Sequence, residues 1–173
     1  MRPLLLLAVT LLGACGDRTA AVPDLVPFQV AGFSQFAQAG DLILGGQPTP
    51  GALRQLADRG FAAIVSTRAA AELDWDEEAT VVSLGMRFVR IPVPLPVSRI
   101  TPAQVAALDR VLASPGGPVV VHCAGGTRAA ALWAVWLSET HGVDPAVTLR
   151  RAELAGMKIL HPIAEQLLGA TGP

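Results

Sequence analysis

One feature of the sequence limits the possible folds more than any other. It is a short apolar run that is followed directly by a glycine turn and an apolar helix. Val119, Val120 and Val121 precede His122, and after Cys-Ala-Gly-Gly-Thr-Arg the chain continues as AAALWAVWLSETHG to Gly142. Such a run is typical of a central parallel strand that is covered on both faces. A helix that is apolar on nearly every side must itself be buried. The segment therefore predicts an α/β protein with a parallel sheet.

The rest of the chain alternates between β-type and helical patterns. Thr49, Thr101 and Asp144 each precede a proline, which is the usual order of an N-cap and a first helical residue. This alternation predicts a central, mostly parallel sheet of four to five strands flanked by helices, with ligand sites beyond the carboxyl ends of the strands. The expected strands are 35–39, 41–45, 61–67, 86–93 and 119–122, and the expected helices are 50–60, 77–85, 102–113, 128–142, 145–155 and 161–168.

The amino-terminal residues have the pattern of an export signal. Arg2 is followed by an apolar run from Leu4 to Leu12, which is too short to span a bilayer. Leu12-Gly13-Ala14-Cys15 resembles the lipobox of bacterial lipoproteins, and an ordinary secretory signal that ends near a cysteine is the alternative. We expect a lipoprotein signal peptide at 1–14, a lipidated Cys15 with a tether at 15–32, and one folded domain at 33–173. The resemblance implies an exported protein, lipid-anchored on the periplasmic side of a bacterial membrane.

Charge excludes one class of partner. The 173 residues include 13 Lys and Arg against 14 Asp and Glu, so no sequence-wide positive field attracts nucleic acid. We expect no nucleic-acid partner. His141 and His161 have no acidic residue or cysteine at ligand spacing, so we expect no metal site.

Cys123 would be the one free thiol of the mature chain, in an oxidising compartment. The loop that it begins lies between a strand and a helix, where backbone N–H groups can converge on an anion. The same positive polarisation favours a thiolate. Arg128, in the first helical turn, can present a planar fork to two phosphate oxygens.

Strand, His-Cys, glycine loop, Arg and helix resemble the phosphate-binding loop of cysteine-dependent tyrosine and dual-specificity phosphatases. Those enzymes usually have five residues between Cys and Arg, whereas this chain has four. The shorter spacing and the other motifs are similar to the phosphatase-like domain named after the bacterial beta-lactamase-hydrolase-like proteins. The similarity runs from about Phe33 to Leu168, and its motifs are LGGQPTP (44–50), IVSTR (64–68), RIPV (90–93), ITP (100–102) and ALWA (131–134).

This resemblance implies hydrolysis of phosphate monoesters through a thiophosphoryl-enzyme intermediate, without a cofactor. Cys123 would be the nucleophile and Arg128 the phosphate clamp. His122 would hold the loop from the strand side, a role compatible with an ordinary core imidazole. Thr127 would donate to the thiolate or the anion. The whole implied phosphate loop is His122, Ala124, Gly125, Gly126, Thr127 and Arg128.

Two positions differ from the phosphatase pattern. The loop that normally supplies an aspartic acid to protonate the leaving group, here 91–102, contains no carboxyl group. Glu72, Asp74 or Asp76 could enter the site from another loop, although a solvated helix start explains these residues more simply. Ala129 stands where many of these phosphatases have Ser or Thr, so hydrolysis of the intermediate is expected to be slow.

Two further functions stay open. The four-residue gap also resembles the compact loop of rhodanese sulfurtransferases, which would hold a persulfide on Cys123. A site without a general acid could instead bind a phosphorylated ligand with little turnover. The sequence leaves the natural substrate undetermined. Trp133 and Trp136, three residues apart in the apolar helix, are interpreted as core residues.

Overall fold

The computed structural model describes residues 23–33, 37–156, 158 and 161–169. The expected signal peptide and Cys15 lie outside the described residues. Within the described ranges, no helix combines the length and the apolar character needed to cross a membrane.

The strands form one mixed sheet in the order β1-β2-β3-β6-β4-β5. The pairs β3–β6, β6–β4 and β4–β5 are parallel, whereas β1–β2 and β2–β3 are antiparallel. The predicted α/β fold with a mostly parallel sheet is therefore confirmed. Strand bounds are β1 Leu25–Pro27, β2 Ala37–Ala39, β3 Leu42–Gly45, β4 Ala63–Ser66, β5 Arg87–Arg90 and β6 Val119–His122.

The described sheet has six strands, where the sequence predicted four to five. The additional strand, β1, lies inside the segment 15–32 that was expected to be a tether, and it pairs with β2. Pro27 has no backbone N–H to offer a partner, but an edge strand tolerates this residue. The ordered domain thus begins before residue 33.

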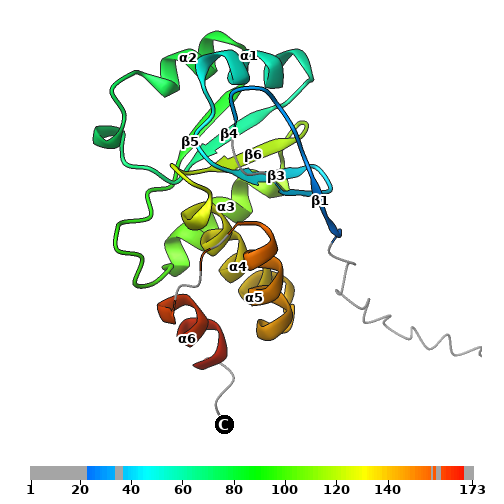
Figure 1. Cartoon of the computed structure of the whole chain (residues 1–173), viewed down its shortest axis with the longest axis vertical. Helices are drawn as coiled ribbons and strands as arrows, with labels where there is room; N and C mark the ends of the chain where they lie inside the picture. Colours follow the sequence, from blue (N-terminus) through cyan, green and yellow to red (C-terminus); the bar gives the residue numbers. More distant parts are fainter. Residues whose placement is uncertain (1–22, 34–36, 157, 159–160, 170–173) are drawn as a thin grey trace, which may run out of the picture.

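The helices cover both faces of the sheet. Figure 1 shows α1 and α2 above the sheet and α3 to α6 below it. Three of the helices start where the sequence predicted, because Thr49, Thr101 and Asp144 accept hydrogen bonds from backbone N–H groups of the first turn. Helix bounds are α1 Pro50–Asp58, η1 Ala70–Glu72, α2 Glu77–Ser83, α3 Pro102–Ala113, α4 Thr127–His141, α5 Pro145–Leu154 and α6 His161–Gly169.

Alternate residues of the central strands pack into two separate cores. Ile64 and Val120 lie in the cluster beneath α1 and α2, whereas Val65 and Val121 lie in the cluster with α3 and α4. This is the period-two alternation of a strand that is covered on both faces. Burying each such side chain stabilises the fold by roughly 1.5–3 kcal/mol.

Helix α4 is buried along most of its length, as its composition predicts. Trp133 is 1% exposed and belongs to the core. Trp136 packs against that core, and its indole Nε1 donates to the Asp109 carboxylate at 3.0 Å. The interpretation of both tryptophans as core residues is confirmed.

The register of the parallel strands places several loops at one end of the sheet. Gly45, Ser66 and His122 are at the same level in β3, β4 and β6. The Cys123 N–H donates to the Gly45 carbonyl at 3.1 Å, and the Thr67 N–H donates to the His122 carbonyl at 2.8 Å. The loops that follow these strands therefore start side by side.

Candidate active site

The loop from Cys123 to Arg128 closes tightly around the cysteine sulfur. Gly126 has a φ of 91°, a left-handed conformation that favours glycine, and its N–H donates to Cys123 Sγ at 3.0 Å. A donor aimed at sulfur stabilises negative charge there. The loop is tied to the neighbouring one because the Gln47 N–H donates to the Ala124 carbonyl at 3.2 Å.

Cys123 lies at a cavity of about 520 Å³ near the carboxyl ends of the strands. The residue is 2% exposed, so the little surface that it retains faces this cavity. Most of the wall is apolar. The cavity is lined by Leu95, Pro96, Val97, Cys123, Ala124, Gly125, Thr127, Arg128, His161 and Pro162.

Arg128 reaches the same cavity but its guanidinium already has partners. Nη1 donates to Glu72 Oε1 at 2.9 Å and to the Val93 carbonyl at 3.2 Å, and Nη2 donates to Glu72 Oε2 at 2.7 Å. The hydrogen bonds to Glu72 are the main reason that the pKa of Arg128 is raised. In turn, the Arg128 hydrogen bond lowers the pKa of Glu72 to about 2. The pair is thus ionised at neutral pH.

A second charged cluster lies behind the loop. His122 and Glu77 are fully buried, with 3.1 Å between His122 Nε2 and Glu77 Oε1. Gln47 Nε2 donates to the same Glu77 oxygen at 2.6 Å. Burial raises the pKa of Glu77, but His122, with Gln47 and Ser66, outweighs burial and lowers it overall. Glu77 is therefore a buried carboxylate beside the His122 ring.

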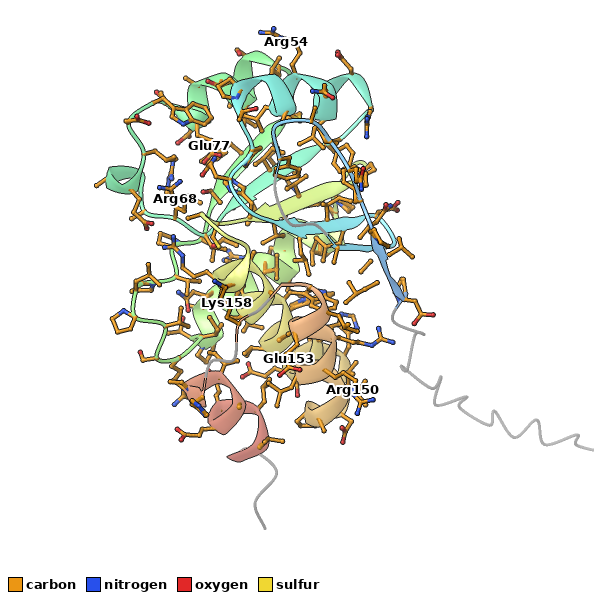
Figure 2. All side chains as sticks on the ribbon, viewed as in Figure 1. Arg54, Arg68, Glu77, Arg150, Glu153 and Lys158 are labelled. Carbon is orange, nitrogen blue, oxygen red and sulfur yellow. The ribbon has the colours of Figure 1, made fainter. Side chains whose placement is uncertain are left out.

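Arg68 joins the two clusters. Its Nη1 donates to Gln47 Oε1 at 2.9 Å, its Nη2 donates to the Glu72 backbone carbonyl, and its Nε lies 3.5 Å from Glu72 Oε2. Figure 2 shows Arg68 and Glu77 at the same end of the sheet. A continuous series of polar side chains thus runs from His122 through Glu77, Gln47, Arg68 and Glu72 to Arg128.

The structure brings together the residues that the sequence singled out. Cys123 and Arg128 share the cavity, whereas His122 is fully buried, directly before the loop, and does not line it. Of the three candidate acids, Glu72 enters the site, but as the ion partner of Arg128. Asp76 caps α2 by accepting from the Ala79 N–H, and Asp74 is exposed, as a solvated helix start predicts.

Sequence reasoning missed four residues at this site, namely Gln47, Arg68, Glu77 and His161. Gln47 and Arg68 lie in motifs that resemble the family, but no local pattern assigned them a role. The only usable signal was position, since both follow the carboxyl ends of parallel strands. In the described ranges, no group of three or more His, Cys, Asp and Glu residues could hold a metal ion.

The fold and the cysteine loop define a protein of the tyrosine and dual-specificity phosphatase class. The chain belongs to the family described as DSP-PTPase phosphatase fused to NAD+ kinase, whose model matches residues 31–162. It is similar to the beta-lactamase hydrolase-like protein of Agrobacterium fabrum, with 29% identity over 139 residues, 69% of this chain and 32% of that protein. A relative from Xylella fastidiosa is 32% identical over 99 residues, 54% of this chain and 22% of its own length. The chain thus spans about a third or less of these relatives.

Solved structures share the fold. TpbA of P. aeruginosa superposes with a TM-score of 0.65 at 18% identity, covering 90% of this chain and 93% of TpbA. Tk-PTP in its active form gives a TM-score of 0.64 at 20% identity, covering 76% of this chain and 90% of Tk-PTP. A DUF442 protein of Shewanella putrefaciens CN-32 gives a TM-score of 0.62 at 21% identity, covering 82% of this chain and 94% of that protein. The expected phosphatase-like family and fold are confirmed.

Proposed function

We propose that this chain hydrolyses phosphate monoesters with Cys123 as the nucleophile. The observation that carries the proposal is that Cys123 and Arg128 line the same cavity, while Cys123 Sγ accepts the Gly126 N–H. A tetrahedral anion over the sulfur would meet the positive end of α4. Arg128 would supply donors for the charge that spreads over the phosphate oxygens in the transition state.

The reaction would proceed in two displacements at phosphorus. The Cys123 thiolate forms an S–P bond while the P–O bond to the leaving alcohol breaks, and the alcohol oxygen takes up a proton. Water then attacks the same phosphorus, the S–P bond breaks, and the thiolate and inorganic phosphate are formed. Splitting the hydrolysis into two steps is the general advantage of a covalent intermediate.

Glu72 would act on this reaction through Arg128. Its carboxylate holds both terminal nitrogens of the guanidinium, which orients the fork beside the cavity. Because the pKa of Glu72 is about 2, Glu72 carries no proton to donate at neutral pH. We therefore assign Glu72 a positioning role.

The test compares the purified chain with Cys123→Ser on p-nitrophenyl phosphate. We expect the serine variant to lose hydrolysis, and tungstate or phosphate to protect Cys123 of the wild type from alkylation. Arg128→Lys keeps the charge but loses the planar fork, so hydrolysis should fall by about 10²-fold or more. Full activity of Cys123→Ser would refute the mechanism.

Two other outcomes would support the alternatives. Binding of tungstate without ester hydrolysis would indicate a phospho-ligand binder, which the lack of a carboxyl group at 91–102 favours. Formation of thiocyanate from thiosulfate and cyanide, without ester hydrolysis, would indicate sulfur transfer.

We also propose that Cys15 is lipidated and holds the protein at the periplasmic face of a bacterial membrane. The support is the Leu12–Cys15 sequence after the apolar run. Replacing Cys15 with serine should move the protein from the membrane fraction to the soluble fraction and abolish labelling by fatty acid. Unchanged membrane association of the variant would contradict the anchor.

A further inference from the structure

The proposed hydrolysis needs a proton for the leaving alcohol, and the carboxyl groups around the site do not supply it. Segment 91–102 has no Asp or Glu. Arg128 keeps Glu72 ionised, and Glu77 is 1% exposed behind the loop with His122 and Gln47. Neither Asp74 nor Asp76 lines the cavity. The donor must therefore be a different kind of side chain.

Among the described residues that line the cavity, three side chains can ionise: Cys123, Arg128 and His161. Cys123 is the proposed nucleophile, and Arg128 does not release its proton in proteins. Imidazole exchanges protons readily near neutral pH, which suits it to acid–base catalysis. His161 is thus the one lining residue with suitable chemistry in the described part of the chain.

The exposure of His161 is compatible with the side of the cavity to which the leaving group must depart. In phosphoryl transfer, the attacking and leaving atoms lie roughly in line with phosphorus. Cys123 is buried, so the leaving oxygen has to point away from it toward the open side of the cavity. His161 is exposed, and no hydrogen bond or ion pair to another described residue occupies its ring.

Helix α6, which begins at His161, is anchored beside the cavity. Ile163 and Leu167 of α6 are buried in the core. Gln166 receives a hydrogen bond from the Ile100 N–H at 2.9 Å and donates one to the Ile100 carbonyl at 2.8 Å. Figure 1 shows α6 beside the β5–α3 segment that contains Ile100. The imidazole is therefore carried by an anchored helix.

We propose that His161 is the acid–base residue of this site, which rests on the function proposed above. The imidazolium gives its proton to the ester oxygen as the P–O bond breaks. The neutral imidazole then accepts a proton from the water that attacks the thiophosphoryl group, which restores the imidazolium. The apolar wall at Leu95, Val97 and Pro162 would contact the organic part of the ester.

The test measures kcat/KM of wild type and His161→Gln with esters that differ in their need for a proton. With an alkyl phosphate or phenyl phosphate, we expect a loss of about 10²–10⁴-fold. With p-nitrophenyl phosphate, whose leaving group departs as an anion, we expect less than about 10-fold. Free imidazole should restore part of the lost rate in His161→Ala.

Glu165→Gln serves as the matched control, since Glu165 is exposed one turn further along α6. This variant should hydrolyse both ester types at the wild-type rate. Equal losses of His161→Gln on both ester types, or no loss on either, would overturn the acid–base role. If Cys123→Ser also retained full activity, the proposed function itself would fail, so the two failures are distinguishable.

Discussion

Replacing Glu77 with alanine should destabilise the protein more than any exposed substitution on the same helix. Glu77 is 1% exposed, and its Oε1 accepts a hydrogen bond from Gln47 Nε2 at 2.6 Å. The same oxygen lies 3.1 Å from His122 Nε2. Removing one member of a buried pair costs about 3–5 kcal/mol, because the other member, here His122, stays buried without it. At about 2–4 °C per kcal/mol for a chain of this size, Tm should fall by roughly 6–20 °C.

Glu78→Ala is the matched control for this experiment. Glu78 is the next residue in the first turn of α2 but is exposed. Both substitutions remove one negative charge near the same helix end, so their difference isolates the buried contacts. We expect Glu78→Ala to change stability by no more than about 0.5 kcal/mol. Equal Tm values for the two variants in thermal unfolding would refute a structural role of the His122–Glu77 pair.

Three more predictions concern neighbouring positions. Gln47→Glu places a second carboxylate beside Glu77, which should lower the free energy of unfolding by about 1–3 kcal/mol at pH 7. The reduction should be smaller in acid, where one of the two carboxyl groups is protonated. Urea unfolding at pH 7 and pH 5 measures both values. Because folding lowers the pKa of Glu72 from 4.5 to about 2, its contribution is complete above pH 4.5 and is lost as pH falls toward 2. Because solvent screens the Glu72–Arg128 pair, this contribution is limited to about 1 kcal/mol. Glu72→Gln should therefore reduce the dependence of the free energy of unfolding on pH between 4.5 and 2. An unchanged dependence would contradict the contribution of Glu72. At Gly126 there is room for a Cβ, whose nearest neighbour would be 3.6 Å away, but alanine would be forced to a φ of 91°. We therefore expect Gly126→Ala to lower the free energy of unfolding by about 1–2 kcal/mol. Gly125→Ala should change it by almost nothing, and thermal unfolding of both variants measures the difference.

The sequence predicted the fold well where the signal is local. The helix starts at Thr49, Thr101 and Asp144 depend on a few consecutive residues, and the structure confirms all three. Strand β1 was missed because Leu25–Pro27 is too short to show a period and lies among prolines. Its pairing depends on β2, which is ten residues further along the chain.

The same distinction explains which parts of the site could be predicted. Cys123 and Arg128 belong to one continuous loop, so their chemistry can be inferred from spacing. Glu77 meets His122 and Gln47 only through the register of separate strands and the placement of α2. In the sequence Glu77 is one acidic residue among several, and nothing local shows that it points inward while Glu78 points outward.

The paired Glu72 and Arg128 also bear on how firmly the site can retain an anion. In the proposed reaction, an incoming phosphate would meet a guanidinium that Glu72 already neutralises, so it would have to share Arg128 with Glu72 or displace that carboxylate. The free energy of phosphate binding would then be the difference between the attraction of Arg128 for phosphate and its attraction for Glu72. On the proposed mechanism, we expect inorganic phosphate to bind weakly, so that it protects Cys123 only at high concentration and leaves the site promptly after each turnover.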